Sequence, residues 1–310
     1  MYARVAAATT AALLGAGALV LPSATAQAAD QKSAPTSART PAQTPAQTPA
    51  SYDRPLVVAH RGASAYAPEN TFAAIDKAAD MGFRWVENDV QRTKDGELVI
   101  VHDDTLTRTT NVEQVFPGRA PWKVKDFTAA EIARLDAGSW FSPKYAGQRV
   151  PTLKQYMNRV SRNHQSLVFE FKKPELYPGI EKQGLAVLRK TGWLDKHHVK
   201  SKLVIQSFSA DSVKEVHKLR PDVKTGFLGT PAVADLPKYA KFADQINSTH
   251  GSVSREYVAA IHATKGPHRK RLEIFTWTVN DAATARKVAG FRVDGIITNT
   301  PDVVRKAISG

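Results

Sequence analysis

Cysteine is absent from the 310 residues, and methionine occurs only three times. Without cysteine the chain can form no disulfide, so an exported protein of this sequence must rely on its core and on bound metal for stability. Thiolate zinc sites are excluded for the same reason. No Gly-x-Gly-x-x-Gly follows an expected strand, which argues against a dinucleotide site. The sequence also contains no recognisable nucleic-acid-binding motif.

Acidic residues are scarce relative to basic ones: 29 Asp and Glu stand against 43 Lys and Arg, a formal net charge of +14. Residues 1–54 hold only four of the basic and two of the acidic residues, so nearly all of the excess lies in the rest of the chain. Positive charge favours anionic partners such as phosphodiesters, lipid headgroups or phosphate-rich wall polymers. An ordinary solvated basic surface is the alternative interpretation.

The chain has one long apolar run near its N-terminus, at residues 5–21. Arg4 precedes this run, and Ala26-Gln27-Ala28 follows it as a small-residue cleavage site. The pattern predicts a secretory signal peptide over residues 1–28. A membrane anchor is the alternative, but the run is short, rich in alanine and without a basic flank at its end. We therefore expect a secreted, extracellular protein, with association with the cell wall as a further option.

Residues 29–54 consist mainly of Ala, Pro, Thr, Gln and Ser and include the repeat TPAQTPAQTPA. Such a composition buries too little apolar surface to offset the entropy lost on ordering, so we predict a disordered linker. The linker either tethers the folded part across a wall or is a plain leader. The folded domain is then predicted to span residues 55–310, with no transmembrane segment in the mature chain.

From residue 55 onward, short apolar runs alternate with amphipathic helical segments. Eight strand–helix units in about 255 residues predict an α/β fold, a (β/α)8 TIM barrel. A doubly wound open sheet is the alternative. Residues 104–150, approximately, interrupt the alternation and are predicted to be a small insertion after the second strand, with Thr128 and Glu131 at the spacing of a capping box. The expected barrel strands are residues 56–59, 84–91, 167–172, 203–208, 224–228, 243–247, 272–279 and 293–298, and the expected helices include residues 153–162, 180–190, 211–219, 254–263, 281–289 and a last one from 301.

Residues 57–103 concentrate the polar side chains that can do chemistry. The first strand ends at His60 and Arg61, and the return strand at 98–101 ends at His102. Glu87 and Asp89 lie two apart on the strand between them, so their side chains leave the same face. Two carboxylates that close repel each other unless one is protonated or a cation lies between them.

Each of these features also has an ordinary interpretation. A histidine after a strand is most often a hydrogen-bonded core or surface residue, and Glu-x-Asp often marks the wet face of an antiparallel sheet. Here Val86 and Val90 occupy the opposite face, and a helix precedes the strand, as in a parallel sheet with both faces covered. A carboxylate pair that points inside such a structure needs a partner.

The active face of a TIM barrel lies at the carboxyl ends of its strands. Glu170 and Lys172 lie two apart at one such end and share a face, although an ion pair that faces solvent is the alternative. The carboxylates of Glu87, Asp89 and Glu170, in a chain without cysteine, make an all-oxygen ligand set suited to Ca²⁺ or Mg²⁺. Further residues at or just beyond expected strand ends are Gln206, Phe208, Trp277 and Asn280.

These motifs in this order resemble the glycerophosphodiester phosphodiesterase family, in its secreted bacterial type. The likeness covers the chain from about residue 55 to the end, and the compound pattern is much more specific than any of its parts. It is carried by His60-Arg61-Gly62, Pro68-Glu69-Asn70-Thr71, Glu87-x-Asp89, Thr93-x-Asp95-Gly96 and His102-Asp103.

The resemblance implies a metal-dependent phosphodiesterase that converts glycerophosphodiesters, such as glycerophosphocholine, to glycerol 3-phosphate and an alcohol. It implies that His60 and His102 are the catalytic pair, since two imidazoles can supply both an acid and a base near neutral pH. Arg61 and Lys172 are expected to hold phosphate oxygens. Which histidine is the acid stays open, as does whether water or a glycerol hydroxyl attacks first. Phe208 and Trp277 are expected to form an apolar wall against the glycerol carbons, with plain packing as the alternative.

Two positions depart from the family pattern. Asn88 is polar where an apolar residue often separates the carboxylates, and Asn299 stands where an acidic residue is common, which weakens any role assigned there. The remaining histidines are interpreted as surface or structural, although His250 could reach the cleft. Two other functions stay open: a phospholipase D-like enzyme that acts on intact lipids, and a non-catalytic basic barrel that binds wall polymer or membrane.

Overall fold

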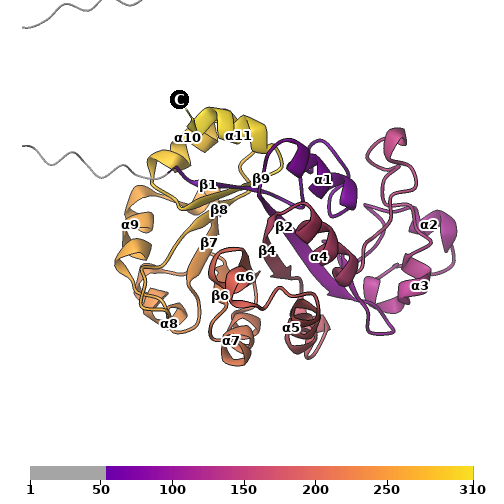
Figure 1. The fold of residues 1–310 in the computed structure, drawn as a ribbon, viewed down its shortest axis with the longest axis horizontal. Coiled ribbons are helices and arrows are strands. Elements are labelled where there is room, and N and C mark those ends of the chain that lie inside the picture. The colour runs from indigo at the N-terminus through magenta and orange to yellow at the C-terminus, as the bar shows by residue number, and fades with distance from the viewer. Residues whose placement is uncertain (1–53, 310) are drawn as a thin grey trace, which may run out of the picture. The chain divides into compact units, whose positions relative to one another are not determined.

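Eight parallel strands close into a ring in the computed structural model, which describes residues 54–309 (Figure 1). The strands are β1 (Leu56–Ala59), β2 (Trp85–Arg92), β4 (Ser166–Phe171), β5 (Leu203–Ser207), β6 (Lys224–Leu228), β7 (Gln245–Thr249), β8 (Phe275–Trp277) and β9 (Gly295–Thr298). Because β1 pairs in parallel with both β2 and β9, the ring has no open edge. The predicted (β/α)8 barrel is confirmed, and the open-sheet alternative is wrong. The predicted signal peptide, and the predicted linker up to residue 53, lie outside the described residues.

Helices follow the strands and lie outside the ring (Figure 1). Thr71 caps α1 (Phe72–Asp80), and Thr152 forms a capping box with Gln155 at the start of α4 (Leu153–Arg162), so both helices satisfy their first free N–H groups. Within residues 54–309 no helix is long and apolar enough to cross a membrane. The other helices around the ring are α5 (Ile180–Lys190), α6 (Lys196–Ser201), α7 (Ala210–Leu219), α8 (Leu236–Tyr239), α9 (Arg255–Ala263), α10 (Ala282–Gly290) and α11 (Pro301–Ile308).

Side chains along β4 alternate between the interior of the ring and its outer face. Val168 belongs to the apolar cluster inside the ring, and Glu170 and Lys172 continue on that side into the cavity at the mouth of the barrel. Phe169 and Phe171 point outward, as predicted, with their ring centroids 4.7 Å apart in an edge-to-face pair.

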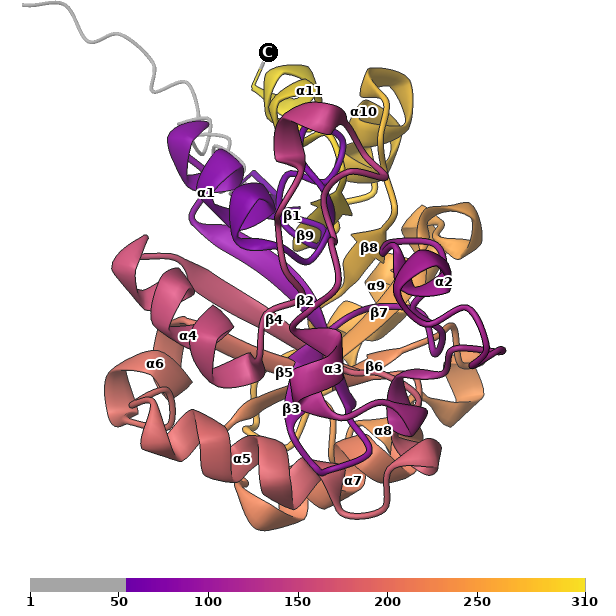
Figure 2. The same ribbon diagram turned by 90° about the vertical axis from the view of Figure 1, so that its right-hand side faces the viewer.

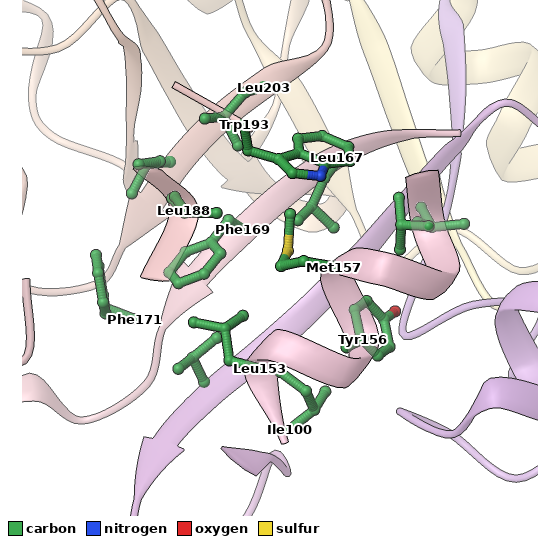
Figure 3. Close-up of a cluster of buried hydrophobic side chains, with 14 of the residues drawn as sticks. Ile100, Leu153, Tyr156, Met157, Leu167, Phe169, Phe171, Leu188, Trp193 and Leu203 are labelled. Atoms are coloured by element: carbon green, nitrogen blue, oxygen red, sulfur yellow. The ribbon is translucent and has the colours of Figure 1, made fainter. Parts of the chain in front are cut away.

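The outer face of β4 is part of a large apolar core shared with α4 and α5 (Figure 3). Tyr156 and Met157 of α4 are fully buried in this core, as is Trp193 after α5. Close packing of this kind leaves few voids and resists displacement. It therefore holds β4, and with it Glu170, in a fixed position.

A hairpin leads from the barrel into the predicted insertion. β3 (Leu98–Ile100) pairs antiparallel with the end of β2, and the chain then forms the short helices α2 (Val112–Val115) and α3 (Ala129–Ile132). The capping box between Thr128 and Glu131 is present. The insertion has its own small apolar core, lies nearest the viewer in Figure 2, and meets the loop after β1 where Tyr145 Oη donates to the Tyr66 carbonyl at 2.7 Å.

The structure differs from the predicted elements in a few places. β8 covers three residues of the predicted 272–279, because Glu273 joins the sheet only through an isolated bridge to Gln245. The short helices α2, α6 and α8 were not predicted, since four to six residues carry no complete apolar stripe. Asn88 lies buried with no hydrogen-bond partner for its amide. It sits between the outward-facing Val86 and Val90, so β2 keeps the predicted orientation.

Candidate active site

The turn after β1 carries His60 and Arg61 to the mouth of the barrel. Arg61 has φ +56° and Gly62 has φ +80°, two consecutive residues in the left-handed region. A Cβ on Gly62 would lie 2.6 Å from backbone atoms of Ala74, so no side chain fits there. The turn directs the backbone N–H of Arg61 to Glu87 Oε2 at 2.9 Å, which joins the end of β1 to β2.

Three buried carboxylates meet in the upper part of the ring. Glu87 and Asp89 come from β2, and Glu170 lies beside Asp89 on the adjacent β4. One oxygen from each lies within 4.8 Å of the others, and each residue is at most 4% exposed. The predicted metal ligands are therefore brought together.

Burial and mutual repulsion control the charge of this triad. Burial, together with the charges of Asp89 and Glu170, holds the pKa of Glu87 well above its ordinary value. Burial and the charge of Asp89 raise the pKa of Glu170 to about 7. Burial also opposes ionisation of Asp89, but the charges of Arg61 and Lys172 outweigh it and lower the pKa of that carboxyl. The site therefore keeps the Asp89 carboxylate ionised, whereas ionisation of Glu87 and Glu170 is disfavoured unless a further positive charge is present.

A divalent cation fits this arrangement. Arg61 Nε lies 3.3 Å from Asp89 Oδ2, and Lys172 Nζ lies 2.8 Å from Glu170 Oε1 and 3.6 Å from Asp89 Oδ1. Three ionised carboxylates beside two cationic side chains leave one uncompensated negative charge. A divalent ion would reverse it to one positive charge, which matches the single negative charge of a phosphodiester. Hard oxygen donors of this kind suit Ca²⁺ or Mg²⁺.

His60 lies beside Glu87, one of the three carboxylates. Its Nδ1–H donates to Asn299 Oδ1 at 2.6 Å, and its Nε2 lies 3.9 Å from Glu87 Oε2. Burial and the adjacent Arg61 charge lower the pKa of His60 to about 4, so the ring is neutral at pH 7. A weakened role was expected at Asn299, and the structure places its Oδ1 as the acceptor for His60 Nδ1–H, a contact that the sequence did not predict.

His102 approaches the same site from the end of the hairpin. Its Nδ1–H donates to Asp103 Oδ1 at 2.6 Å. Burial lowers the pKa of His102, although Asp89 and Asp103 oppose that effect. Both histidines therefore have Nδ1 engaged, one by a neutral amide and the other by a carboxylate, which leaves Nε2 of each ring for chemistry.

The cavity at the mouth has a volume of about 100 Å³. Phe208 and Trp277 form one wall, with ring centroids 5.5 Å apart and planes nearly perpendicular, and Phe208 is 49% exposed. Of the predicted catalytic, substrate-binding and metal-binding residues, all but Asp89 line the cavity. Asn280 and His250, which were considered as residues near the cleft, do not line it. The lining residues are His60, Arg61, Glu87, His102, Glu170, Lys172, Gln206, Phe208, Leu228, Trp277, Thr278 and Ile297.

Several residues that contact the site were not predicted as site residues. Glu69 accepts a hydrogen bond from Arg61 Nη1 at 2.9 Å, and Arg108 donates to both Glu69 and Asp103. Glu69 and Asp103 lie inside motifs that match the family, and this position in the motifs could have indicated a role at the site. Asn299 was noted only as a departure from the family pattern. Arg108 carried no signal, because it is 39 residues from Glu69 in the sequence.

Comparison with known proteins identifies the family of this site. A sequence model of the glycerophosphoryl diester phosphodiesterase family matches residues 60–303. The chain belongs to this family. As a glycerophosphodiester phosphodiesterase it is an enzyme, a phosphoric diester hydrolase, so the non-catalytic alternative is wrong.

Individual relatives agree with the family assignment. The glycerophosphodiester phosphodiesterase of Bacillus subtilis (strain 168) is 36% identical over 274 residues, which cover 84% of this chain and 88% of the relative. That of Caldanaerobacter subterraneus subsp. tengcongensis is 34% identical over 250 residues, which cover 80% of this chain and 96% of the relative. Among solved structures, an Oleispira antarctica phosphodiesterase in complex with the product sn-glycerol-3-phosphate has a TM-score of 0.69 and 28% identity, and covers 83% of this chain and 98% of that chain.

Proposed function

We propose that this glycerophosphodiester phosphodiesterase hydrolyses glycerophosphodiesters to glycerol 3-phosphate and an alcohol, and that it requires Ca²⁺ or Mg²⁺ held by Glu87, Asp89 and Glu170. The observation that carries the proposal is the buried carboxylate triad together with two imidazoles that line the same cavity. The similar Oleispira antarctica enzyme, which was solved with sn-glycerol-3-phosphate, supports the product. A cavity of about 100 Å³ suits the glycerophosphate half of a substrate.

The cation, when bound, would act as a Lewis acid on a phosphate oxygen. Arg61 and Lys172 are the side chains that would bind the remaining phosphate oxygens. Both are held against the carboxylates, which restricts their rotamers before substrate arrives. Binding a phosphodiester with positioned charges costs little reorganisation at the moment of reaction.

The two histidines would divide the proton transfers. His60 is neutral at pH 7 and its Nδ1–H is engaged by Asn299, so its Nε2 is available to accept a proton from the attacking oxygen. His102 donates to the Asp103 carboxylate, which partly opposes the lowering of its pKa by burial, so of the two rings it is the one assigned to donate a proton to the leaving alkoxide.

The function is tested by turnover of glycerophosphocholine by the purified protein. EDTA should abolish release of glycerol 3-phosphate, and Ca²⁺ or Mg²⁺, added separately, should restore it. His60→Ala and His102→Ala should each reduce kcat by about 100-fold or more while the circular dichroism spectrum is unchanged. Full activity in EDTA would overturn metal dependence, and near-normal rates in either variant would overturn its catalytic role. Turnover of phosphatidylcholine instead of glycerophosphocholine would favour the lipid-phosphodiesterase alternative.

A change of leaving group separates the two histidine roles. In a p-nitrophenyl ester of glycerol phosphate the leaving group is p-nitrophenolate, which departs without being protonated. The loss of kcat in His102→Ala should therefore be much smaller on this ester than on glycerophosphocholine. His60→Ala should remain inactive on both esters, because the attacking oxygen still needs a base. The reverse pattern would exchange the two assignments.

The proposal includes secretion. The apolar run at residues 5–21 and the small residues Ala26 and Ala28 support cleavage before Ala29, which would leave the linker at residues 29–54 as the N-terminal segment of the secreted protein. N-terminal sequencing of the protein from culture medium should begin at Ala29. Retention of the full chain inside the cell would contradict secretion.

A further inference from the structure

Arg108 lies in the insertion, yet its guanidinium is bonded to two carboxylates at the edge of the active site. Nη1 and Nη2 donate to the two oxygens of Glu69 at 2.7 and 2.8 Å. Nε donates to Asp103 Oδ2 at 2.7 Å, and Nη2 also reaches Asp103 Oδ1 at 3.2 Å. A planar guanidinium with several donors can serve two carboxylates in this way, whereas a lysine ammonium is a point charge.

Each of these carboxylates in turn holds a residue of the cavity. Glu69 Oε1 accepts from Arg61 Nη1 at 2.9 Å, so Arg61 and Arg108 share one carboxylate that is only 11% exposed. Asp103 Oδ1 accepts from His102 Nδ1 at 2.6 Å. Arg108 is thus linked through Glu69 to Arg61, the expected phosphate-binding arginine. It is linked through Asp103 to His102, the expected acid.

We propose that Arg108 is a positioning residue that fixes Arg61 and His102 relative to each other, and so connects the insertion to the two halves of the site. This inference rests on the roles given to Arg61 and His102 in the proposed function. Without Arg108, Glu69 would have Arg61 as its single charged partner and would draw it away from the cavity. Asp103 would lose two donors that fix its plane, and the His102 ring would be free to turn with it.

Arg108 can act on the geometry of the site as well as on stability. Its side chain is 43% exposed, so it contributes little apolar burial to the core. Its bonds to Glu69 are bidentate and belong to a network of charges, so they can also stabilise the fold. A geometric effect on catalysis comes in addition, because small displacements of positioned groups cost rate. Burial raises the pKa of Asp103, but hydrogen bonds from Arg108 and His102 outweigh it and lower the pKa to about 2.

The test compares Arg108→Ala with Arg149→Ala. Arg149 is a matched control, because it also belongs to the insertion and donates to the backbone carbonyls of Arg134 and Leu135, away from the site. Arg108→Ala should lower kcat/KM for glycerophosphocholine by about 10- to 100-fold, with KM raised through Arg61 and kcat lowered through His102. Arg149→Ala should leave kcat/KM of the folded protein unchanged.

Chemical rescue supplies a readout that a structural role would not move. Because the side chain is partly exposed, guanidinium at millimolar concentration should enter the space left by Arg108→Ala and restore part of kcat/KM, with no effect on Arg149→Ala. Adding Asp103→Asn to Arg108→Ala should cost less than the two separate losses combined, since both act on His102.

The outcomes separate the inference from the proposed function. An inactive wild-type protein would defeat the proposed function itself. An active wild type with Arg108→Ala within about twofold of it, or with a loss that guanidinium does not restore, would overturn the role of Arg108. If Arg108→Ala does not fold, Arg108→Lys replaces it: a lysine cannot bind both carboxylates, so a kcat/KM equal to that of the wild type would overturn the role.

Discussion

At the scale of single residues, Glu170 illustrates how burial sets chemistry. Its pKa is raised to about 7 in the metal-free protein, mainly by burial and then by Asp89, against about 4.5 when unfolded. Between these values the folded state binds more protons than the unfolded state. The contribution of Glu170 to the free energy of unfolding is therefore fully present below pH 4.5 and is lost as the pH rises through 7.

Glu170→Gln should remove the loss of stability that ionisation of Glu170 causes as the pH rises. In EDTA at pH 8 the variant should be more stable than the wild type by about 1–3 kcal/mol, and the difference should vanish at pH 4. Urea unfolding at the two pH values measures it. Added Ca²⁺ or Mg²⁺ should stabilise the wild type and have little effect on the variant. A variant that is less stable than the wild type at pH 8 in EDTA would contradict the repulsion within the triad.

Asn299 accepts a hydrogen bond from His60 and brings no charge to that ring. A carboxylate in its place would lie 2.6 Å from His60 Nδ1 and favour the imidazolium. Asn299→Asp should therefore raise the pKa of His60 and move the acidic limb of the pH–kcat/KM profile to higher pH by about one unit. Asn280→Asp is the control, because Asn280 accepts from the Asn299 backbone N–H at 2.9 Å and does not contact His60. If the acidic limb does not shift in Asn299→Asp, ionisation of His60 does not produce that limb.

The sequence indicates which side chains share a face of a strand, but it does not indicate their partners from distant segments. Glu87 and Asp89 could be assigned to one face because a strand has a period of two, and the structure places them so. His60 and Asn299 are 239 residues apart, so no local pattern could pair them. Arg108 reaches Glu69 only because the insertion folds back against the loop after β1.

At the scale of elements, the turn after β1 is the most constrained segment of the site. Gly62→Ala would place a methyl group 2.6 Å from the Ala74 backbone and impose a left-handed φ on a residue with a side chain. We expect a loss of stability of about 2 kcal/mol or more and a large loss of kcat/KM, because Arg61 and His60 move with the turn. Urea unfolding and turnover measure the two effects.

Gly96 is the matched control for that substitution. It has φ +90° in the β2–β3 turn, but a Cβ there would meet nothing within 4 Å. Gly96→Ala should therefore cost only backbone strain, about 1 kcal/mol, and leave kcat/KM unchanged. Equal losses in Gly62→Ala and Gly96→Ala would show that close contact with Ala74 does not shape the site.

Element boundaries could be predicted where the local pattern is strong. The strand at 224–228 and the helix at 153–162 agree with β6 and α4 residue for residue. The predicted strand at 272–279 was too long, because Leu272 and Ile274 fill the outer apolar core beyond the regular pairing of β8. Local hydrophobicity predicts burial there, whereas sheet pairing depends on neighbouring strands.

At the scale of the whole molecule, closure of the ring is what assembles the site. Glu170 lies about eighty residues from the two carboxylates of β2, yet pairing of β4 with β2 sets it beside Asp89. The expected barrel placed Glu170 and the β2 carboxylates at the same end of the strands, and the family resemblance favoured their joint role over an ion pair that faces solvent. A cation that bridges the two strands would then stabilise the folded barrel over the unfolded chain, by about 2.7 kcal/mol at a hundredfold excess over Kd.

The central claim is that one divalent cation is bound by carboxylates from β2 and β4. Isothermal titration calorimetry of the EDTA-treated, dialysed protein with Ca²⁺, and separately with Mg²⁺, tests it most directly. The wild type should bind at least one of these ions at a single site, and Glu87→Gln and Glu170→Gln should each weaken that binding strongly. Unchanged binding in both variants, or an active wild type that binds neither ion, would contradict the account.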